Sequence, residues 1–543
     1  MTRDALMSLL DRGVTASRLR HLLVATALLL LPVQVLAVPA LFYSDLDSGP
    51  NSGGQNDKGV FVTVWGRGLG NSQGNGNVTV GGVPADNYPL WSDTKIVFQL
   101  AENAKSGNIV VKASNGENSN GIPFTVRSGR IFFVSPNGSG SGSITRPMSP
   151  SAVYNSIRPG DIFYLRAGSY SGSYGGSWGA RNFAFGRIQS GRADKPVAFV
   201  GYPNEVAVLV AADLNSGSNI VLRNNGGDTD LAHYMTFANL TFVGGGSCVS
   251  GGGWWKTEGS GATHGRLVGN VFSARYCNSC NTMTGLISID GAGWRVFGNE
   301  FKDTGGNPPI NNNHAVYVNT GADDVEIGWN YFHDLRMGHV IQVHTDIAYL
   351  YEDIRIHDNL LTAANVNDSR GINVGRTLPG SYGVIYNNVL SNLGQDFSAI
   401  VMYSGTWKLF NNTLHNIHAT ATRSSAAIWI GGMATAEVRN NIIHVNSLSQ
   451  YIAAYSGAST SQLSLSNNLY FGNGPGPGQD QDLAGINADP LFVNPNAGDF
   501  HLQSGSPAVD GGHSAVGTVV TVDRDGVGRP RGAGFDIGAY EFR

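Results

Sequence analysis

The sequence predicts an all-β protein: a right-handed parallel β-helix, which is a solenoid of stacked coils, preceded by a small immunoglobulin-like β-sandwich. Three observations favour this fold class. The 543-residue chain contains 74 glycines and only 14% charged residues, a composition typical of short strands joined by tight turns. The first part of the chain alternates apolar and polar residues in short runs, and an asparagine motif recurs through the middle at near-constant spacing.

The N-terminus predicts export. A basic stretch that ends at His21 precedes the apolar run 22–37, and the small residues Ala37 and Ala40 follow as candidate cleavage sites. This order is typical of a secretory signal peptide, so we expect residues 1–37 to be removed and the protein to be secreted, to the extracellular space or the periplasm of a bacterium. A membrane anchor is the alternative, but the run is short for a span of about 20 residues. No later stretch is apolar enough to cross a membrane, so we expect no transmembrane segment after cleavage.

Residues 38–127 predict the sandwich. Short runs alternate apolar and polar residues between turns rich in glycine and asparagine, as strands of a half-buried antiparallel sheet do. Examples are Val60 to Val64, Asn77 to Val80, Lys95 to Phe98 and Asn108 to Val111.

The turns of this region resemble those of the IPT/TIG family of immunoglobulin-like domains. A glycine-rich turn, Gly66-Arg67-Gly68-Leu69-Gly70, follows the first long strand, and a Gly-Gly-Val-Pro-Ala turn at Gly81 to Ala85 follows the next. The resemblance implies a spacer or carbohydrate-associated module that has no chemistry of its own.

Residues 128–488 predict the β-helix. The segment opens with a strand at Ile131 to Val134, a short helical stretch that ends near Ile157, and a strand at Ile162 to Leu165. This opening resembles the first coil of secreted bacterial β-helix proteins, which implies a helix that caps the open end of the solenoid. Such a cap is needed because a bare coil exposes both core and strand edge.

A repeated asparagine is the strongest evidence for coils. Short strands end at Asn239, Asn270, Asn299, Asn330, Asn359, Asn388, Asn412, Asn441 and Asn468, with successive spacings between 24 and 31 residues. Units of this length hold two or three short strands and no long helix, so each is one coil of a solenoid. Asparagine tolerates the left-handed backbone of a turn, and stacked coils bring its amide within reach of the next asparagine, about 4.8 Å away.

Residues 489–543 predict a cap or extension of the β-helix. They contain Asp489-Pro490-Leu491-Phe492 and end in Asp536-Ile537-Gly538-Ala539-Tyr540-Glu541-Phe542. The segment resembles the C-terminal part of secreted bacterial β-helix proteins grouped under the name choice-of-anchor Q, which implies architecture rather than a reaction. We interpret its acidic residues as parts of turns, with calcium binding as the alternative.

The three cysteines predict a disulfide. Cys248, Cys277 and Cys280 lie seven to ten residues after the asparagine of their coil, at nearly matching positions on adjacent coils. In an oxidising compartment we expect Cys248 to pair with Cys277 or Cys280. A zinc site is the alternative, for which a lone Cys-x-x-Cys is weak evidence.

A second apolar strand follows each asparagine turn, and its outward residues predict the functional face. Residues just before this strand should stack as Gly285, His314, His339, Arg370, Ser398 and Ala426. Outward residues within it should stack as Ser288, Tyr317, Gln342, Asn373, Val401 and Trp429, and as Asp290, Asn319, His344, Gly375, Tyr403 and Gly431. One face of the middle coils would then gather histidine, arginine and aromatic side chains into a partly cationic strip, with Arg376 in an adjoining turn.

Such a strip suits an extended sugar chain, so we expect the partner to be an extracellular, anionic polysaccharide. Aromatic faces would stack on sugar rings, and arginine would bind carboxylates. The candidate substrate-binding residues are Gln342, His344, Asn319, Asn373, Arg376, Tyr403 and Trp429. We expect the protein to act as a monomer. The net charge of −4 gives no reason to expect a nucleic-acid partner.

The predicted fold resembles the pectate-lyase-like superfamily, which implies a polysaccharide lyase that cleaves uronate linkages by β-elimination. Arg370 or Arg376 would neutralise the carboxylate, His314 or His339 would be the base, and Tyr317 the acid. The chain departs from calcium-dependent pectate lyases, because its strip lacks their lysine base and their cluster of aspartates. It also lacks the Asp-Pro-His motif of alginate epimerases. A calcium requirement therefore stays open, and we assign no other cofactor.

Two alternatives to a lyase stay open. A glycoside hydrolase would need paired carboxylates, and Asp290, Asp303, Asp323, Asp324, Asp346 and Asp368 form no evident pair in the sequence. A carbohydrate-binding or cell-surface structural protein without catalysis would suit the same fold.

Overall fold

The computed structural model describes residues 38–543 except 176–180, 214–216, 225–228, 245–246, 252–260, 274–284, 311–312, 345–348, 365–368, 376, 395–396, 419–425, 447–449, 455–462 and 473–481. Residues Pro39–Arg543 form one compact unit. The predicted signal peptide falls on residues 1–37, which lie outside the described residues, so export stays a prediction. None of the helices in the described part is long and apolar enough to cross a membrane.

The N-terminal region is a β-sandwich of two small sheets. One sheet has the order β1 (Ala40–Ser44), β3 (Phe61–Arg67), β7 (Lys95–Gln99) and β6 (Asn87–Trp91). The other has the order β2 (Ser48–Gly49), β9 (Ile122–Val126), β8 (Gly107–Lys112), β4 (Asn77–Val80) and β5 (Val83–Pro84). Alternate residues such as Val62, Val64, Val78 and Val80 are buried, so the period-two pattern of the sequence produces the sandwich core.

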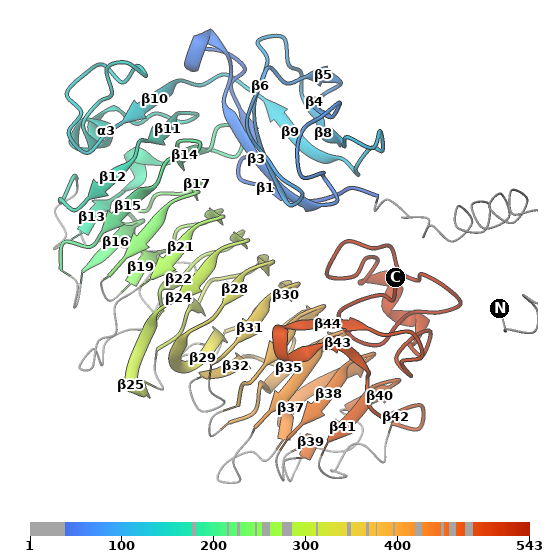
Figure 1. Ribbon diagram of the computed structural model, residues 1–543. Coiled ribbons are helices and arrows are strands. Elements are labelled where there is room, and N and C mark those ends of the chain that lie inside the picture. Colours follow the sequence, from blue (N-terminus) through green and yellow to red (C-terminus); the bar gives the residue numbers. More distant parts are fainter. Residues whose placement is uncertain are drawn as a thin grey trace, which may run out of the picture. The chain divides into compact units, whose positions relative to one another are not determined.

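The remainder is a parallel β-helix in which each coil contributes strands to three ladders, and Figure 1 shows the strands following one another as successive rungs. The first ladder contains β10 (Ile131–Val134), β11 (Ile162–Leu165), β14 (Val197–Gly201), β17 (Met235–Ala238), β20 (Arg266–Val268), β23 (Arg295–Phe297), β27 (Val325–Gly328), β30 (Ile354–His357), β33 (Tyr382–Tyr386), the later parts of β35 (Ile400–Phe410) and β37 (Ala426–Arg439), and β40 (Leu463–Ser466).

The second ladder contains β13 (Arg181–Ala184), β16 (Ser218–Val221), β19 (Ser247–Ser250), β22 (Ile287–Ile289), β26 (Val316–Val318), β29 (Leu335–Val343), β32 (Ser369–Val374), the first parts of β35 and β37, and β39 (Gln450–Ala454), with β25 (Thr304–Ile310) beside β29. The third contains β12 (Gly168–Tyr170), β15 (Ala207–Val210), β18 (Thr241–Val243), β21 (Val271–Ser273), β24 (Glu300–Lys302), β28 (Tyr331–Phe332), β31 (Leu360–Thr362), β34 (Val389–Ser391), β36 (Thr413–Ile417), β38 (Ile442–Val445), β41 (Leu469–Gly472) and β42 (Ile486–Asn487).

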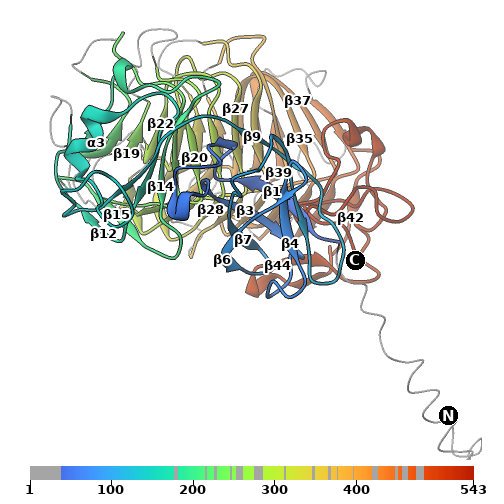
Figure 2. The same cartoon turned by 90° about the horizontal axis from the view of Figure 1, so that it is seen from above.

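The inward side chains of the three ladders form one continuous hydrophobic core. At its start lies helix α3 (Pro150–Ser156), whose Val153 is fully buried in that core; Figure 2 shows this helix at the β12 end of the stack. The predicted capping helix is therefore confirmed. It removes the first coil's apolar interior from water, where its exposure would be costly.

The predicted asparagine ladder runs through the turn between the first and third ladders. From Asn270 to Asn468, each asparagine donates its backbone N–H and its Nδ2 to the Oδ1 of the next, at 2.9–3.1 Å. The ladder ends on the Asp482 carboxylate, which accepts from Asn468 Nδ2 at 2.8 Å. These buried amides are paired both along the stack and to backbone carbonyls, which avoids the cost of unsatisfied polar groups.

Two details of the asparagine prediction are wrong by one position. Asn239 is not in the ladder, since Leu240 holds the equivalent place and donates its N–H to Asn270 Oδ1 at 3.0 Å. The left-handed backbone belongs to the residue before each ladder asparagine: Asn239, Gly269, Gly298, Trp329, Asp358, Asn387, Asn411, Asn440 and Asn467, with φ between +52° and +64°. Many coils carry two polar residues in a row at this turn, so the sequence alone did not separate the two roles.

The sandwich covers the outer face of the first ladder in the early coils. A shared core joins Val60 and Val62 of the sandwich to outward residues such as Tyr164, Val200 and Phe297. Two left-handed positions are glycine where the domains touch. A Cβ at Gly298 would lie 1.8 Å from Tyr43 Oη, and one at Gly269 would lie 2.5 Å from Trp65 Cζ2. Glycine is therefore required here for close approach as well as for backbone angle.

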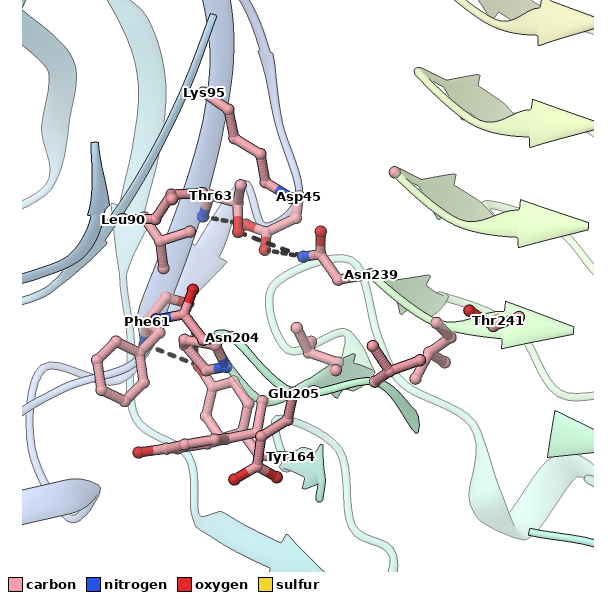
Figure 3. A pocket seen from close by; sticks show the side chains of 18 of the residues that line it. Asp45, Phe61, Thr63, Leu90, Lys95, Tyr164, Asn204, Glu205, Asn239 and Thr241 are labelled. Atoms are coloured by element: carbon pink, nitrogen blue, oxygen red, sulfur yellow. Dashed lines mark hydrogen bonds between the residues drawn. The ribbon is translucent and has the colours of Figure 1, made fainter. Parts of the chain in front are cut away.

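A pocket of about 350 Å³ lies in the seam between the sandwich and the coils, and Figure 3 shows Asp45 and Asn239 facing one another within it. Asp45 Oδ1 accepts from the N–H groups of Leu46 and Thr63, each at 2.8 Å, and its Oδ2 accepts from Asn239 Nδ2 at 2.8 Å. Burial raises the pKa of Asp45 to about 6. The seam is thus anchored by a buried carboxyl group as well as by apolar packing.

The C-terminal segment packs on the outer faces of the later coils. Phe492 of β43 (Phe492–Asn494), Phe500 of β44 (Asp499–Leu502) and Tyr540 pack on outward residues of the third ladder. Its acidic residues serve turns: Asp523 accepts the N–H groups of Val527 and Glu541, and Glu541 forms a fully buried ion pair with Arg529 at 2.6 Å. The fold gives these residues an architectural use, while the likeness to choice-of-anchor Q segments stays a prediction.

Candidate functional site

The second ladder places side chains in the stacked columns that the sequence predicts. Tyr317 pairs with Ser288 and Gln342, Gln342 with Asn373, and Val401 with Asn373 and Trp429. The inward neighbours Val316, Ile341, Ile372, Ile400 and Ile428 are fully buried in the solenoid core. The predicted register of this face is therefore confirmed, and it brings together residues about 30 positions apart in the chain.

Two histidines and an arginine stack at the bend just before these strands. His339 and Arg370 are paired neighbours on β29 and β32, and His314 Nδ1 lies 2.6 Å from the His339 carbonyl oxygen. His314 is 4% and His339 5% exposed, so the expected open strip is closed over these two rings. Arg370 beside them is only partly buried. The cationic end of the face is therefore a pair of buried imidazoles beside a partly exposed guanidinium, here called the His–Arg cluster.

Phe397 contacts both His339 and Arg370 of this cluster, and the sequence does not predict its position. Its ring meets His339 edge-on at 5.4 Å between centroids, and the Arg370 guanidinium lies 5.0 Å from its centre. Phe397 holds the arginine by a cation–π contact. It lies in a turn outside the repeated strands, so periodicity gave no signal for its position.

Both stacked histidines are neutral at neutral pH. Burial, and to a lesser extent the charges of His344 and Arg370, lower the pKa of His314 to about 4. Burial and the Arg370 charge lower the pKa of His339 well below its usual value. Because His314 Nδ1 faces a carbonyl oxygen, that nitrogen carries the proton, and Nε2 is left with a lone pair. His314 thus has the form that a general base requires.

Tyr317 and His344 form the more accessible part of the face. The Tyr317 hydroxyl lies 3.4 Å from His344 Nδ1, and the Tyr317 ring stacks on His314 at 5.5 Å. Gly375 stands next to His344 in the column, where a Cβ would lie 2.1 Å from His344 Cδ2. Glycine at this position therefore makes room for the imidazole.

Amide side chains line the same face and leave polar atoms unpaired. Asn373 donates to Gln342 Oε1 at 2.9 Å, and Asn319 donates to Asp290 Oδ1 at 2.9 Å. Buried Asn319 Oδ1, Asn373 Oδ1 and His339 Nδ1 have no hydrogen-bond partner among the described residues. Unpaired buried polar atoms are costly in folded proteins, so these three atoms are a departure from the pairing of the asparagine ladder.

An aromatic pair lies on the same face, on the two coils that follow that of Asn373. Tyr403 and Trp429 contact edge-to-face at 4.8 Å between ring centroids, and Tyr403 is 37% exposed. Both side chains are outward on β35 and β37. The face therefore changes along the stack from cationic and amide groups to aromatic rings.

Several predicted site features remain untested. Arg376, Asp346 and Asp368 lie outside the described residues, as do Cys277 and Cys280. Cys248 is a buried free thiol on β19, and its pairing with either cysteine stays a prediction. In the part of the chain that the structure describes, no three histidine, cysteine or acidic side chains are grouped to hold a metal ion. Asp290 is the one carboxylate among the described stacked positions, and its oxygens accept from Ser288 and Asn319.

Comparisons with known proteins support the two-part organisation. Residues 47–126 match the IPT/TIG domain family. No curated protein matches this sequence. Similar solved structures include pectate lyase Pel9A (15% identity, 77% of this chain and 97% of that chain, TM-score 0.37), the family 6 alginate lyase AlyGC (14%, 69% and 55%, 0.38), and XylC in complex with xylose (9%, 76% and 99%, 0.41). These likenesses concern the fold alone. The chain thus has a domain that matches the IPT/TIG family, and the strands that follow it form a parallel β-helix.

Proposed function

We propose that the second-ladder face binds an acidic extracellular polysaccharide and cleaves its uronate linkages by β-elimination. The observation that carries this proposal is the His–Arg cluster: His314, His339 and Arg370 are stacked on consecutive coils beside Tyr317. The sandwich packs on the first ladder and the C-terminal segment on the first and third. Among the described residues, neither of these packs on the outward side chains of the second ladder.

Each residue of the His–Arg cluster, and Tyr317 beside it, has a role in the elimination. Arg370 binds the uronate carboxylate, which stabilises the negative charge that develops when the adjacent carbon loses its proton. His314 Nε2 takes that proton, the electron pair forms the carbon–carbon double bond, and the glycosidic carbon–oxygen bond breaks. Tyr317 donates its proton to the leaving oxygen and regains one from solvent. His339, buried beneath Arg370 and Phe397, positions the arginine.

The remaining face binds neighbouring sugar residues. Gln342 and His344 are partly exposed and offer hydrogen bonds to sugar hydroxyls, and the amides of Asn319 and Asn373 lie beside them on the same face. Tyr403 and Trp429 offer ring faces on which a distal sugar stacks. Arg376 is a further carboxylate ligand in this proposal, and calcium a further counter-ion.

The test measures ultraviolet absorbance of unsaturated uronate during incubation with alginate, polygalacturonate and a neutral glucan. We expect absorbance to rise with an acidic polymer and to be lost in His314→Gln. The matched control is His333→Gln, which changes a partly buried histidine on the third-ladder side that pairs with Glu300 and Asp334. Full activity in both His314→Gln and His339→Gln would contradict the assignment of base and positioning group.

A glycoside hydrolase is the second candidate, and the buried Asp290 at the edge of the face is the observation that favours it. New reducing ends without ultraviolet absorbance, lost in Asp290→Asn, would identify this activity. Binding without either product would identify a carbohydrate-binding module.

A further inference from the structure

A second hollow lies outside the proposed active site, where the turns that lead from the second ladder into the first ladder meet the sandwich. One part has a volume of about 560 Å³ and is lined by Asp47, Ser48, Thr125, Tyr234, His264 and Arg266. The other has a volume of about 530 Å³ and is lined by Arg187, Arg192, Ala193, His233 and Tyr234. Because Tyr234 and Ala193 line both parts, they form one groove, here called the seam groove.

An aromatic platform lies in the middle of the seam groove. The rings of Tyr234 and His264 stack at 4.3 Å between centroids with an interplanar angle of 15°. Tyr234 and His264 occupy equivalent positions on consecutive coils, and Gly293 occupies that position on the next coil. A Cβ at Gly293 would lie 2.7 Å from His264 Cδ2, so the glycine keeps side-chain atoms off the outer face of the imidazole.

The backbone of this platform is strained. Tyr234 and His264 have φ of +54° and +57°, a left-handed conformation that is unfavourable for side chains of this size. The equivalent positions of later coils hold residues that tolerate it, Gly293, Asp324 and Asp353. Strain of this kind persists where surrounding structure holds it and often marks a binding site.

Guanidinium groups flank the platform. Arg187 and Arg192 are exposed at one end, and neither forms an ion pair with a described residue. At the other end, Arg266 donates to the Ser44 carbonyl at 3.0 Å, while its buried Nε has no partner in the described part of the chain. Two carboxylates are also present, and Asp47 lies 3.7 Å from Arg266. The groove thus combines ring faces with donors suited to carboxylates.

We propose that the seam groove is a non-catalytic binding site for an acidic oligosaccharide, with a sugar ring on the Tyr234–His264 platform and its carboxylates on Arg187 and Arg192. The sandwich completes the site by supplying Ser48 and Thr125. The hydroxyl groups of Ser48 and Thr125 line the same hollow as Tyr234 and His264, and in this proposal they bond to sugar hydroxyls. The sandwich therefore contributes to substrate capture as well as covering the coils, and the second site holds a polymer while another stretch of it occupies the second-ladder face.

The test measures binding to full-length Arg370→Gln, in which cleavage is expected to be slow, by calorimetry and by hydrogen exchange. The probes are an alginate hexasaccharide and a galacturonate hexasaccharide, with cellohexaose as the neutral control. We expect one acidic probe to protect the backbone amides of 187–195 and 230–236. Tyr234→Ala should abolish that protection, Tyr234→Phe should keep it, and Arg187→Ala with Arg192→Ala should weaken binding about tenfold.

The matched control is Tyr331→Ala, which removes an exposed tyrosine on the third ladder and should leave protection of the groove unchanged. Failure of both acidic probes to protect these segments overturns the proposal, as does equal protection by cellohexaose or full protection in a folded Tyr234→Ala protein. The outcome is separable from catalysis: lyase activity without groove protection rejects the seam groove alone, and groove protection without lyase activity rejects the proposed reaction alone.

Discussion

Two buried histidines on neighbouring ladders show how differently the solenoid treats its faces. On the first ladder, His357 donates or accepts at both nitrogens, to Asp358 at 2.7 Å and to Glu326 at 3.0 Å. Although burial lowers its pKa, these two carboxylates raise it to about 9. On the second ladder, His339 meets Arg370 and Phe397, its pKa lies well below the usual value, and its Nδ1 has no partner among the described residues.

The two faces differ in what covers them. The first-ladder face is packed against the sandwich and the C-terminal segment, which bury outward aromatic residues such as Tyr164 and Phe297. The second-ladder face keeps cations beside neutral imidazoles and leaves amide oxygens unpaired, an arrangement that stability alone would not favour. This contrast supports the proposed ligand on the second-ladder face, whereas packing accounts for buried residues such as Phe297 on the first ladder.

The largest expected effect is on the second ladder. Arg370→Gln removes the charge that would bind the uronate carboxylate, so we expect kcat/KM on an acidic polysaccharide to fall roughly 10²–10³-fold, measured by ultraviolet absorbance. Arg355→Gln is the control, because Arg355 points outward on the first ladder and pairs with Asp353 and Glu326. Equal losses in the two variants would mean that the faces do not differ in function.

A substitution at the first ladder should instead act on stability. Gly298→Ala places a Cβ against Tyr43 Oη in a left-handed backbone, so we expect a loss of roughly 2–5 kcal/mol in the free energy of unfolding. Chemical denaturation measures it. The control is Gly82→Ala, which has φ +80° and open space around the added Cβ, and it should cost only about 1 kcal/mol. A loss no greater than that of the control would show that Tyr43 and its neighbours shift to make room for the added methyl group.

Much of this contrast was predictable from the sequence. The spacing of the asparagine motif placed Tyr317, Gln342 and Asn373 in one column, and the strands at Ile131–Val134 and Ile162–Leu165 lie where the apolar runs predict them. Stacked coils convert a regular spacing into contact, so the pattern of residues carries the register directly.

The covering of each face was not predictable in the same way. Which ladder the sandwich covers depends on tertiary packing. The sequence shows it only indirectly, through glycine at Gly269 and Gly298, where the coils after Trp329 have Asn or Asp, and through outward aromatics such as Phe297. The burial of His314 and the position of Phe397 depend on turns that follow no repeat. Periodicity therefore predicts the columns but not what lies over them.

The pH dependence of stability should test the role of Asp45, which is buried in the seam between the sandwich and the first ladder. The pKa of Asp45 is raised from 3.8 to about 6, so its contribution to stability is complete below pH 4 and is lost as the pH rises through 6, by about 3 kcal/mol at most. Asp45→Asn should abolish this loss, because the oxygen of the introduced amide would keep the two backbone bonds and its nitrogen would donate to Asn239 Oδ1 once the Asn239 amide turns over. Melting temperatures from pH 4 to 8 measure the difference; parallel curves for the two proteins would place the titration elsewhere.

The smallest effect concerns the pH profile of the second-ladder face. If His314 is the base, kcat/KM should fall as the pH drops through about 4, because protonated His314 cannot accept a proton. Burial is the main cause of this low pKa and the Arg370 charge a lesser one, so the residual activity of Arg370→Gln should show its acid limb at a slightly higher pH. His344→Gln should shift the limb in the same direction, since the His344 charge also lowers the pKa of His314. An acid limb that stays in place in both variants would assign the proton transfer to a group other than His314.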